Sequence, residues 1–95
     1  MLNDPEYNQR LLDECKRLIA VTDTAIYFPD PISVKITPHT ELFRCYGVVI
    51  TKDDELKLMD PNEEWHGVEV EQKNAGYILQ SLFQRLKSNS YRKTA

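Results

Sequence analysis

Apolar residues recur at three- and four-residue spacing near the start of the chain, which is the period of an α-helix with one buried face. The stripe is formed by Tyr7, Leu11, Cys15, Leu18 and Ile19. Ahead of it, Asp4-Pro5-Glu6 supplies an N-cap acceptor, a proline at the first helical position and an acid near the positive end of the helix. The pattern predicts a half-buried helix over about residues 5–20.

Two short segments with β-like patterns follow this helix. Residues 24–28 are rich in β-forming side chains and stop at Pro29-Asp30-Pro31, where two prolines remove backbone donors and favour a turn. Residues 32–36 then alternate between apolar and polar, which is typical of a strand with one buried side. The sequence therefore predicts two short strands separated by a turn.

The longest β-like run covers residues 42–51 and is apolar on both of its faces. A strand of this kind is usually central in its sheet and covered on both sides. An acidic turn separates it from a partner strand at residues 56–58, and a second acidic turn precedes a last strand at residues 65–70. We therefore expect consecutive hairpins in this part of the chain.

The strongest periodic signal lies near the C-terminus, in a helix expected to begin at about Gln72 or Asn74. Its apolar face is formed by Ala75, Ile78, Leu79, Leu82, Phe83 and Leu86. The helix ends in polar residues 87–90, and we expect residues 91–95 to form a flexible tail. Residues 1–90 then make a single domain, because a chain of 95 residues can build one core but not two.

Together these elements predict an α+β fold of order α-β-β-β-β-β-α with a mostly antiparallel sheet. Each terminal helix has an apolar stripe to bury, so both are expected side by side on one face of the sheet. The opposite face is then partly apolar and contains Tyr46 or Phe43, depending on the strand register. Exposed apolar area of this kind is commonly a subunit interface.

The composition is that of an ordinary globular protein, with 41% hydrophobic and 28% charged residues. Two cysteines, Cys15 and Cys45, cannot form the disulfide framework of a small secreted domain. The N-terminus has no basic and apolar leader pattern, and no apolar run approaches the ~20 residues that a membrane span needs. We expect a cytoplasmic protein without a membrane segment.

The formal net charge of −3 conceals an uneven distribution along the chain. Residues 52–71 carry eight acids against two lysines, whereas residues 72–95 carry five bases and no acid. Opposite charges on one small body favour complementary association, with a second copy or with a partner protein.

The residues that carry chemistry show no catalytic or metal-binding spacing. A zinc site usually has closely spaced pairs of cysteines or histidines. The chain has no such pair among its four potential soft ligands, which are Cys15, His39, Cys45 and His66. The acid clusters at residues 53–55 and 60–64 lack the glycine and spacing of a calcium loop. Burial in a strand would raise the pKa of Cys45, which disfavours a nucleophilic role with His39 as base. We predict no catalytic residue, metal, cofactor or small-molecule ligand.

Two groups of side chains are candidates for contact with a partner. The aromatic candidates for an interface are Tyr27, Phe28, Tyr46 and Trp65. The basic candidates are Arg85, Lys87, Arg92 and Lys93. Basic residues with Tyr91 among them suit a nucleic acid, but a pI near 5.3 and the acidic hairpin disfavour a polyanion.

We therefore expect a non-enzymatic protein-interaction or assembly module that forms a homodimer, or binds a partner protein, through its sheet. One alternative is a small ligand-binding domain or enzyme with its site between the helices and the sheet. The other alternative is a nucleic-acid-associated accessory protein that uses the basic C-terminal end.

Overall fold

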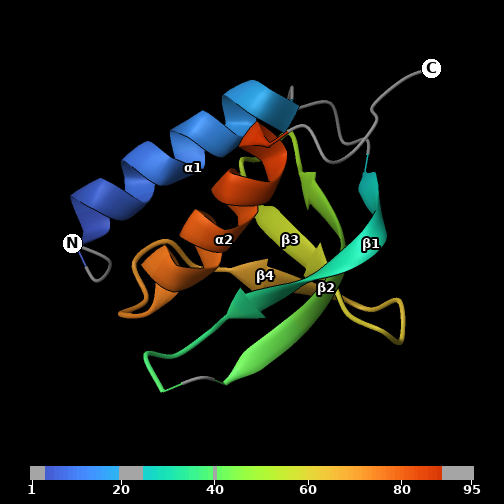
Figure 1. Ribbon diagram of the computed structural model, residues 1–95. Helices are drawn as coiled ribbons and strands as arrows, with labels where there is room; N and C mark the ends of the chain where they lie inside the picture. Colours follow the sequence, from blue (N-terminus) through green and yellow to red (C-terminus); the bar gives the residue numbers. More distant parts are fainter. Residues whose placement is uncertain (1–3, 20–24, 40, 89–95) are drawn as a thin grey trace.

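A computed structural model describes residues 4–19, 25–39 and 41–88 of the chain. In chain order the elements are α1 (Pro5–Ile19), β1 (Ile26–Lys35), β2 (Leu42–Ile50), β3 (Leu56–Met59), β4 (Trp65–Val68) and α2 (Ala75–Lys87) (Figure 1). The strands form one sheet of order β1-β2-β3-β4 in which every neighbouring pair is antiparallel. The predicted α+β class is confirmed.

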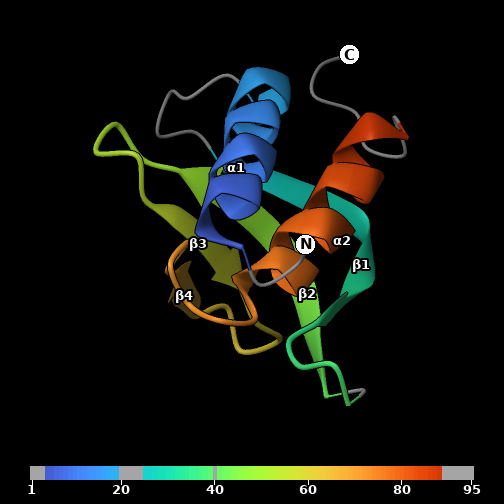
Figure 2. The same cartoon turned by 90° about the vertical axis from the view of Figure 1, so that its left-hand side faces the viewer.

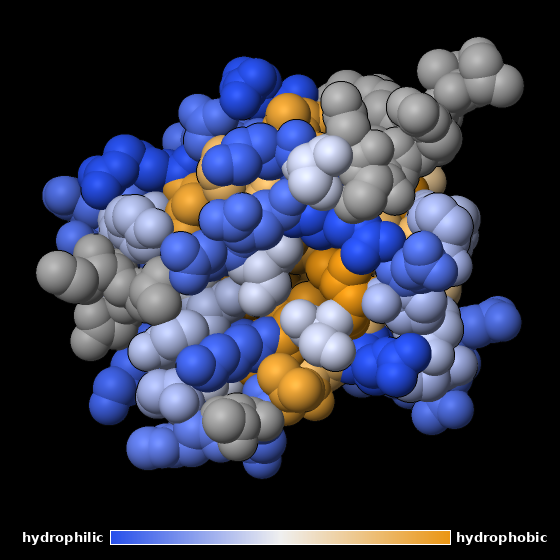
Figure 3. Space-filling view, in the orientation of Figure 1, coloured by the Kyte–Doolittle hydropathy of each residue, from blue (hydrophilic) through white to orange (hydrophobic). Residues whose placement is uncertain are grey.

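Both helices lie on the same face of the sheet, side by side (Figures 1 and 2). They pack against each other, and α2 also packs against β1. Their apolar stripes close over the inward side chains of the strands to make one core, as both amphipathic patterns require. The largest fully buried apolar side chains are Ile50, Leu56, Leu79, Leu82, Leu86, Val34 and Val48. Most of the surface seen from the side of Figure 1 is hydrophilic (Figure 3).

The described sheet has four strands rather than the expected five, because the two predicted N-terminal strands are one strand. β1 pairs with β2 through Ile26 and Tyr27, loses register over residues 28–31, and resumes pairing at Ile32 opposite Cys45. Pro29 and Pro31 cannot donate a ladder hydrogen bond, and an edge strand tolerates them in a bulge. The prolines therefore interrupt the pairing without ending the strand.

The bulge is held from the helix layer by Arg85 of α2. Its Nη2 donates a hydrogen bond of 2.6 Å to the main-chain oxygen of Asp30, and its guanidinium lies 5.3 Å from the centre of the Phe28 ring. A cation over an aromatic face and a charged donor to a carbonyl are both favourable contacts. This side chain, predicted as a basic contact for a partner, has a structural role in the bulge.

The N-terminus of α1 has the predicted N-cap residue, Asp4. The Asp4 Oδ1 atom accepts a hydrogen bond of 3.0 Å from the main-chain N–H of Glu6, which satisfies one donor of the first turn. Further along the helix, Asn8 is fully buried, and its Nδ2 donates to the main-chain oxygen of Val70 at 3.1 Å. Asn8 therefore ties α1 to the segment that follows β4.

Two hairpin turns share one backbone pattern. The turn between β2 and β3 is closed by hydrogen bonds from Thr51 N to the oxygen of Glu55 and from Asp54 N to the oxygen of Thr51. The turn between β3 and β4 has the same bonds between Asp60 and residues 63–64. The residue before the last position of each turn has a positive φ, 66° at Asp54 and 65° at Glu63. Glycine adopts this conformation without the steric cost that a side chain brings.

Replacing Glu63 by glycine should therefore stabilise the fold. We expect the free energy of unfolding to rise by about 0.5 to 1 kcal/mol. Glycine removes the steric strain of a side chain at φ 65°, and this gain exceeds the cost of glycine's greater conformational entropy in the unfolded chain. Urea unfolding measures it. Asn62→Gly, in the same turn but at a residue without positive φ, should lose stability, and a loss of stability in Glu63→Gly would contradict the assignment.

Within the described ranges, neither helix is both long and apolar enough to cross a membrane.

Candidate functional site

The side of the sheet turned away from α1 and α2 has no described element packed on it (Figures 1 and 2). We call this surface the open face. Its side chains alternate along the strands with residues of the buried core, such as Ile26, Cys45 and Leu58. The open face is formed by Tyr27, Leu42, Arg44, Tyr46, Val49, Thr51, Lys57, Met59 and Trp65.

An aromatic pair spans the open face from one edge of the sheet to the other. Tyr27 of β1 and Trp65 of β4 have ring centroids 6.4 Å apart at an interplanar angle of 58°. They stand in one row of the sheet, with Gly47 and Met59 between them, because Tyr27 pairs with Gly47, Gly47 with Met59, and Met59 with Trp65. Strands are about 4.8 Å apart, so the two rings must lean toward each other across the middle strands.

Gly47 makes this approach possible. A Cβ atom at this position would lie 3.2 Å from Cδ1 of Tyr27 and 3.1 Å from the main-chain oxygen of Ile26. Any larger residue would therefore push the Tyr27 ring away from its place over the sheet. Gly47 therefore allows the aromatic pair to approach the sheet closely.

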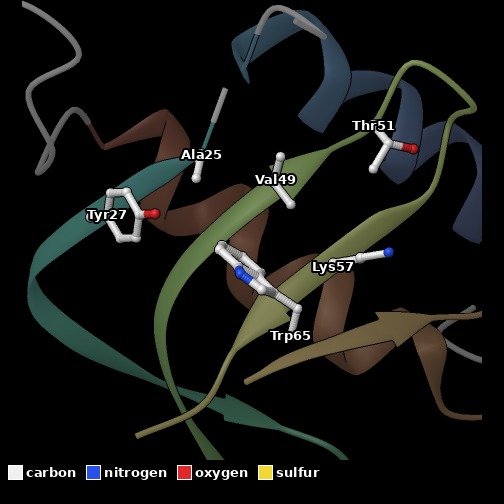
Figure 4. Close-up of a pocket in the computed structure, with 6 residues that line it drawn as sticks. All are labelled: Ala25, Tyr27, Val49, Thr51, Lys57 and Trp65. Atoms are coloured by element: carbon white, nitrogen blue, oxygen red, sulfur yellow. The ribbon is translucent and has the colours of Figure 1, made fainter. Parts of the chain in front are cut away.

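The pair remains exposed in spite of the ring contact. Tyr27 is 61% exposed and Trp65 is 37% exposed, and Leu42 at the end of β2 is 60% exposed. Beside the rings is an open hollow of about 420 Å³, lined by Ala25, Tyr27, Val49, Thr51, Lys57 and Trp65 (Figure 4). Large exposed aromatic side chains next to a shallow hollow are typical of an interaction surface.

Charged side chains of both signs lie at each end of the open face. At the end where β2 begins, Arg44 is exposed and its guanidinium lies 6.0 Å from the Tyr46 ring. The turn between β3 and β4, with its acids at residues 60–64, lies at this same end, because Met59 pairs with Gly47. At the other end, the turn between β2 and β3 holds exposed Lys52, Asp53 and Glu55, and Glu55 Oε1 lies 3.7 Å from Nζ of Lys57.

The predicted interface residues divide between the open face and the core. Tyr27 and Trp65 form the aromatic pair, and Tyr46 is half-buried on the same face. Phe28 is only 5% exposed and belongs to the core, so it cannot contribute to an exposed interface. The reason is alternation along β1, where Phe28 follows the outward Tyr27 and turns inward toward Arg85.

The predicted basic group is not one surface in the described part of the chain. Arg85 is half-buried beside Phe28, whereas Lys87 is exposed with its Nζ 5.0 Å from the Phe83 ring. Arg92 and Lys93, and the predicted tail at residues 91–95, lie outside the described residues. Leu42 and Met59 also point outward and were not among the predicted interface residues, although their alternation with Cys45 and Leu58 indicates this side of the sheet.

Both cysteines are free and fully buried. Burial, with a smaller contribution from the charge of Glu14, raises the pKa of Cys15 from 9.0 to about 12. Burial likewise raises the pKa of Cys45 to about 11. A thiolate is therefore strongly disfavoured at either position at neutral pH, which weighs against a cysteine nucleophile.

These two thiols make stability fall at high pH. The folded protein keeps both protons over a range in which the unfolded chain has lost them, so the free energy of unfolding decreases as pH rises above about 9. Each thiol removes about 1.4 kcal/mol per pH unit in that range. Urea unfolding at about pH 8 and about pH 10 measures the decrease. A variant with Cys15→Ala and Cys45→Ala should show a shallower decrease, and an unchanged slope would contradict the assignment.

Asp60, Glu64 and His66 form the one described group of three potential metal ligands, with ligand atoms within 4.8 Å of one another. Carboxylate and imidazole donors of this kind suit zinc or manganese. Here Asp60 Oδ1 accepts hydrogen bonds from the N–H groups of Asn62 and Glu64, and Asp60 Oδ2 lies 2.7 Å from Nε2 of His66. The bond from His66 lowers the pKa of Asp60. Asp60 and His66 therefore contact each other in the turn before β4, with the Glu64 carboxylate close by.

The chain matches no protein-family model, no curated protein and no solved structure.

Proposed function

We propose that the protein is a non-enzymatic interaction module that binds another protein chain through the open face of its sheet. The observation that carries this proposal is the exposed Tyr27 and Trp65 pair, held over Gly47 on a face that no described helix covers. Tyrosine and tryptophan bring a large contact area to an interface and lose few rotatable bonds on binding. Their exposure in the isolated chain is the state expected before a partner arrives.

The charge of the molecule favours protein over nucleic acid as the partner. The net charge is −3, and the acids of the β2 to β3 turn lie at one end of the open face. A polyanion would meet repulsion there, and the contact of Arg85 with the β1 bulge already accounts for one basic candidate. A mixed-sign face around an aromatic centre resembles the polar rim and apolar core of a protein interface.

The chemistry of the described residues also favours binding over catalysis. Both thiols are buried with raised pKa values, and His66 is engaged by Asp60. Free cysteines agree with a reducing compartment, so we keep a cytoplasmic location as part of the proposal.

Site-specific photo-crosslinking in the cells that make the protein tests this proposal. A benzophenone amino acid in place of Tyr27 should form a covalent adduct with protein, and the adduct should be lost when Trp65 is also changed to serine. Gln84, exposed on α2, is the matched control position and should give no such adduct. Adducts with nucleic acid alone, or equal yields from both positions, would contradict the proposal.

A further inference from the structure

We infer that Asp60, Glu64 and His66, in and beside the turn between β3 and β4, bind one divalent transition-metal ion, and that Zn²⁺ suits these donors best. This site goes beyond the proposed function and does not depend on it. It replaces the sequence-based expectation that the chain holds no metal.

The three side chains bring their donor atoms to one place. One imidazole nitrogen and one oxygen from each carboxylate lie within 4.8 Å of one another. Zinc binds nitrogen and oxygen ligands at about 2.0 to 2.2 Å, so two ligands of a tetrahedral ion are about 3.4 Å apart. The Asp60 and His66 atoms are now 2.7 Å apart, and they need to separate by less than about 1 Å to share an ion. A small movement of side chains is therefore sufficient.

The imidazole distinguishes this group from an ordinary acidic turn. Calcium and magnesium are bound by oxygen ligands, whereas an imidazole nitrogen suits zinc and other transition metals. The negative charges of two carboxylates balance the charge of one divalent cation. Zinc often takes three protein ligands of these types and a water molecule in the fourth position. The composition of the group therefore selects a transition metal.

Two of the three ligands are held in position by further contacts. The Asp60 side chain is only 14% exposed, and its Oδ1 accepts hydrogen bonds from the main-chain N–H groups of residues 62 and 64 at 2.8 and 2.9 Å. Its Oδ2 is thereby directed to His66. The His66 ring meets the Phe43 ring edge to face, with centroids 5.6 Å apart. Supporting contacts that orient the ligands strengthen a metal site.

The third ligand, Glu64, is available for an ion. Its side chain is exposed, and within the described ranges no lysine or arginine forms an ion pair with it. A carboxylate beside two oriented donors can complete the site by rotating its own side chain. The two fixed ligands therefore set the place of the ion, and Glu64 closes it.

The metal site lies apart from the open face. His66 pairs with Leu58 of β3, and directly paired residues of neighbouring strands point to the same side of a sheet. Leu58 is only 3% exposed and belongs to the core, so His66 lies on the helix side, whereas its neighbour Trp65 lies on the open face. A bound ion links the turn to β4 without covering the aromatic pair.

Isothermal titration calorimetry of the full, untagged chain with zinc chloride tests the inference. We expect binding of a single Zn²⁺ ion, weakened by about tenfold or more in Glu64→Gln and in His66→Ala, because each substitution removes one ligand. Glu63→Gln is the matched control. It removes the same charge from the same turn but no ligand, and it should keep the affinity within about threefold.

NMR of the two histidine rings gives a second readout that a purely structural effect would not move. Saturating zinc should shift the ring signals of His66 and leave those of His39 unchanged. Thermal unfolding without zinc should show that Glu64→Gln and His66→Ala remain folded, since both side chains are exposed.

The outcomes either support or overturn the site. A zinc dissociation constant above about 1 mM would overturn it. Equal losses in Glu63→Gln and Glu64→Gln would also overturn it, because they would show attraction to the acidic turn as a whole rather than coordination. The crosslink from position 27 should be unchanged in Glu64→Gln, so that failure of the metal site and failure of the proposed function are distinguishable.

Discussion

Changing Trp65 to serine should weaken binding of the partner protein by about 30-fold or more. The ring is 37% exposed in the single chain and contacts Tyr27 at the rim of the hollow, where the partner would bury it. A central tryptophan in an interface commonly contributes at least 2 kcal/mol, and 1.4 kcal/mol corresponds to a tenfold change in affinity.

The yield of the photo-crosslink from position 27, with and without Trp65→Ser, measures this loss. Tyr7→Ser is the control, since it removes a half-buried aromatic residue from α1 on the other side of the sheet. Thermal unfolding should show that Trp65→Ser remains folded, because its ring lies outside the buried core. A folded Trp65→Ser variant that is crosslinked to protein as well as the unaltered chain would contradict the role of the open face.

Changing Asn8 to aspartate should destabilise the fold by about 3 kcal/mol at neutral pH. Asn8 is fully buried, and its amide nitrogen donates to the main-chain oxygen of Val70 at 3.1 Å. An ionised carboxylate has no proton to donate and would place negative charge beside that oxygen, away from water. The position lies near the positive end of α1, which offsets only a part of the cost.

The effect of Asn8→Asp should depend on pH in a definite direction. Burial raises the pKa of the new carboxyl in the folded state above its value in the unfolded chain, so the folded state binds more protons and gains stability as pH falls. The protonated acid can again donate to Val70. Urea unfolding at about pH 7 and about pH 4.5 tests this, with Gln9→Glu as the exposed control on the same helix. Equal losses in both variants would contradict the importance of the buried amide.

The sequence predicted the two helices more accurately than it predicted the sheet. Apolar periodicity and the Asp4 cap predicted α1, which begins at Pro5 as expected and receives the cap hydrogen bond. Periodicity predicted α2 from about residue 72 or 74, and the helix begins at Ala75. Both signals are local. The backbone hydrogen bonds of a helix join residues four apart, and its apolar stripe repeats within a few turns.

The sheet was predicted less well where the outcome depended on distant residues. Pro29 and Pro31 indicated a turn between two strands, but pairing with β2 on both sides of the bulge, and the contact of Arg85 with Asp30, keep β1 continuous. The local sequence around the prolines does not indicate these contacts with distant residues. Phe28 was predicted on the interface with Tyr27, although alternation along β1 points the two side chains to opposite sides of the sheet.

The sequence predicted which residue types form the candidate site, but not how those residues are arranged. Tyr27 and Trp65 were chosen only because aromatic side chains are common in interfaces. Their meeting over Gly47 depends on the register of all four strands, which the chain sets through its turns and packing rather than through any short motif. The sequence analysis considered the acids at residues 60–64 and His66 separately, and so did not predict that Asp60, Glu64 and His66 form one group in the turn before β4.

Acrylamide quenching of the single tryptophan, in the isolated chain and in the complex captured from position 27, tests the central claim most directly. Trp65 is the one tryptophan in the chain, and it lies on the open face. If another protein covers that face, the quenching constant of Trp65 should be severalfold lower in the complex, and its emission should shift to the blue. A quenching constant of Trp65 that is the same in the complex and in the isolated chain would contradict the account.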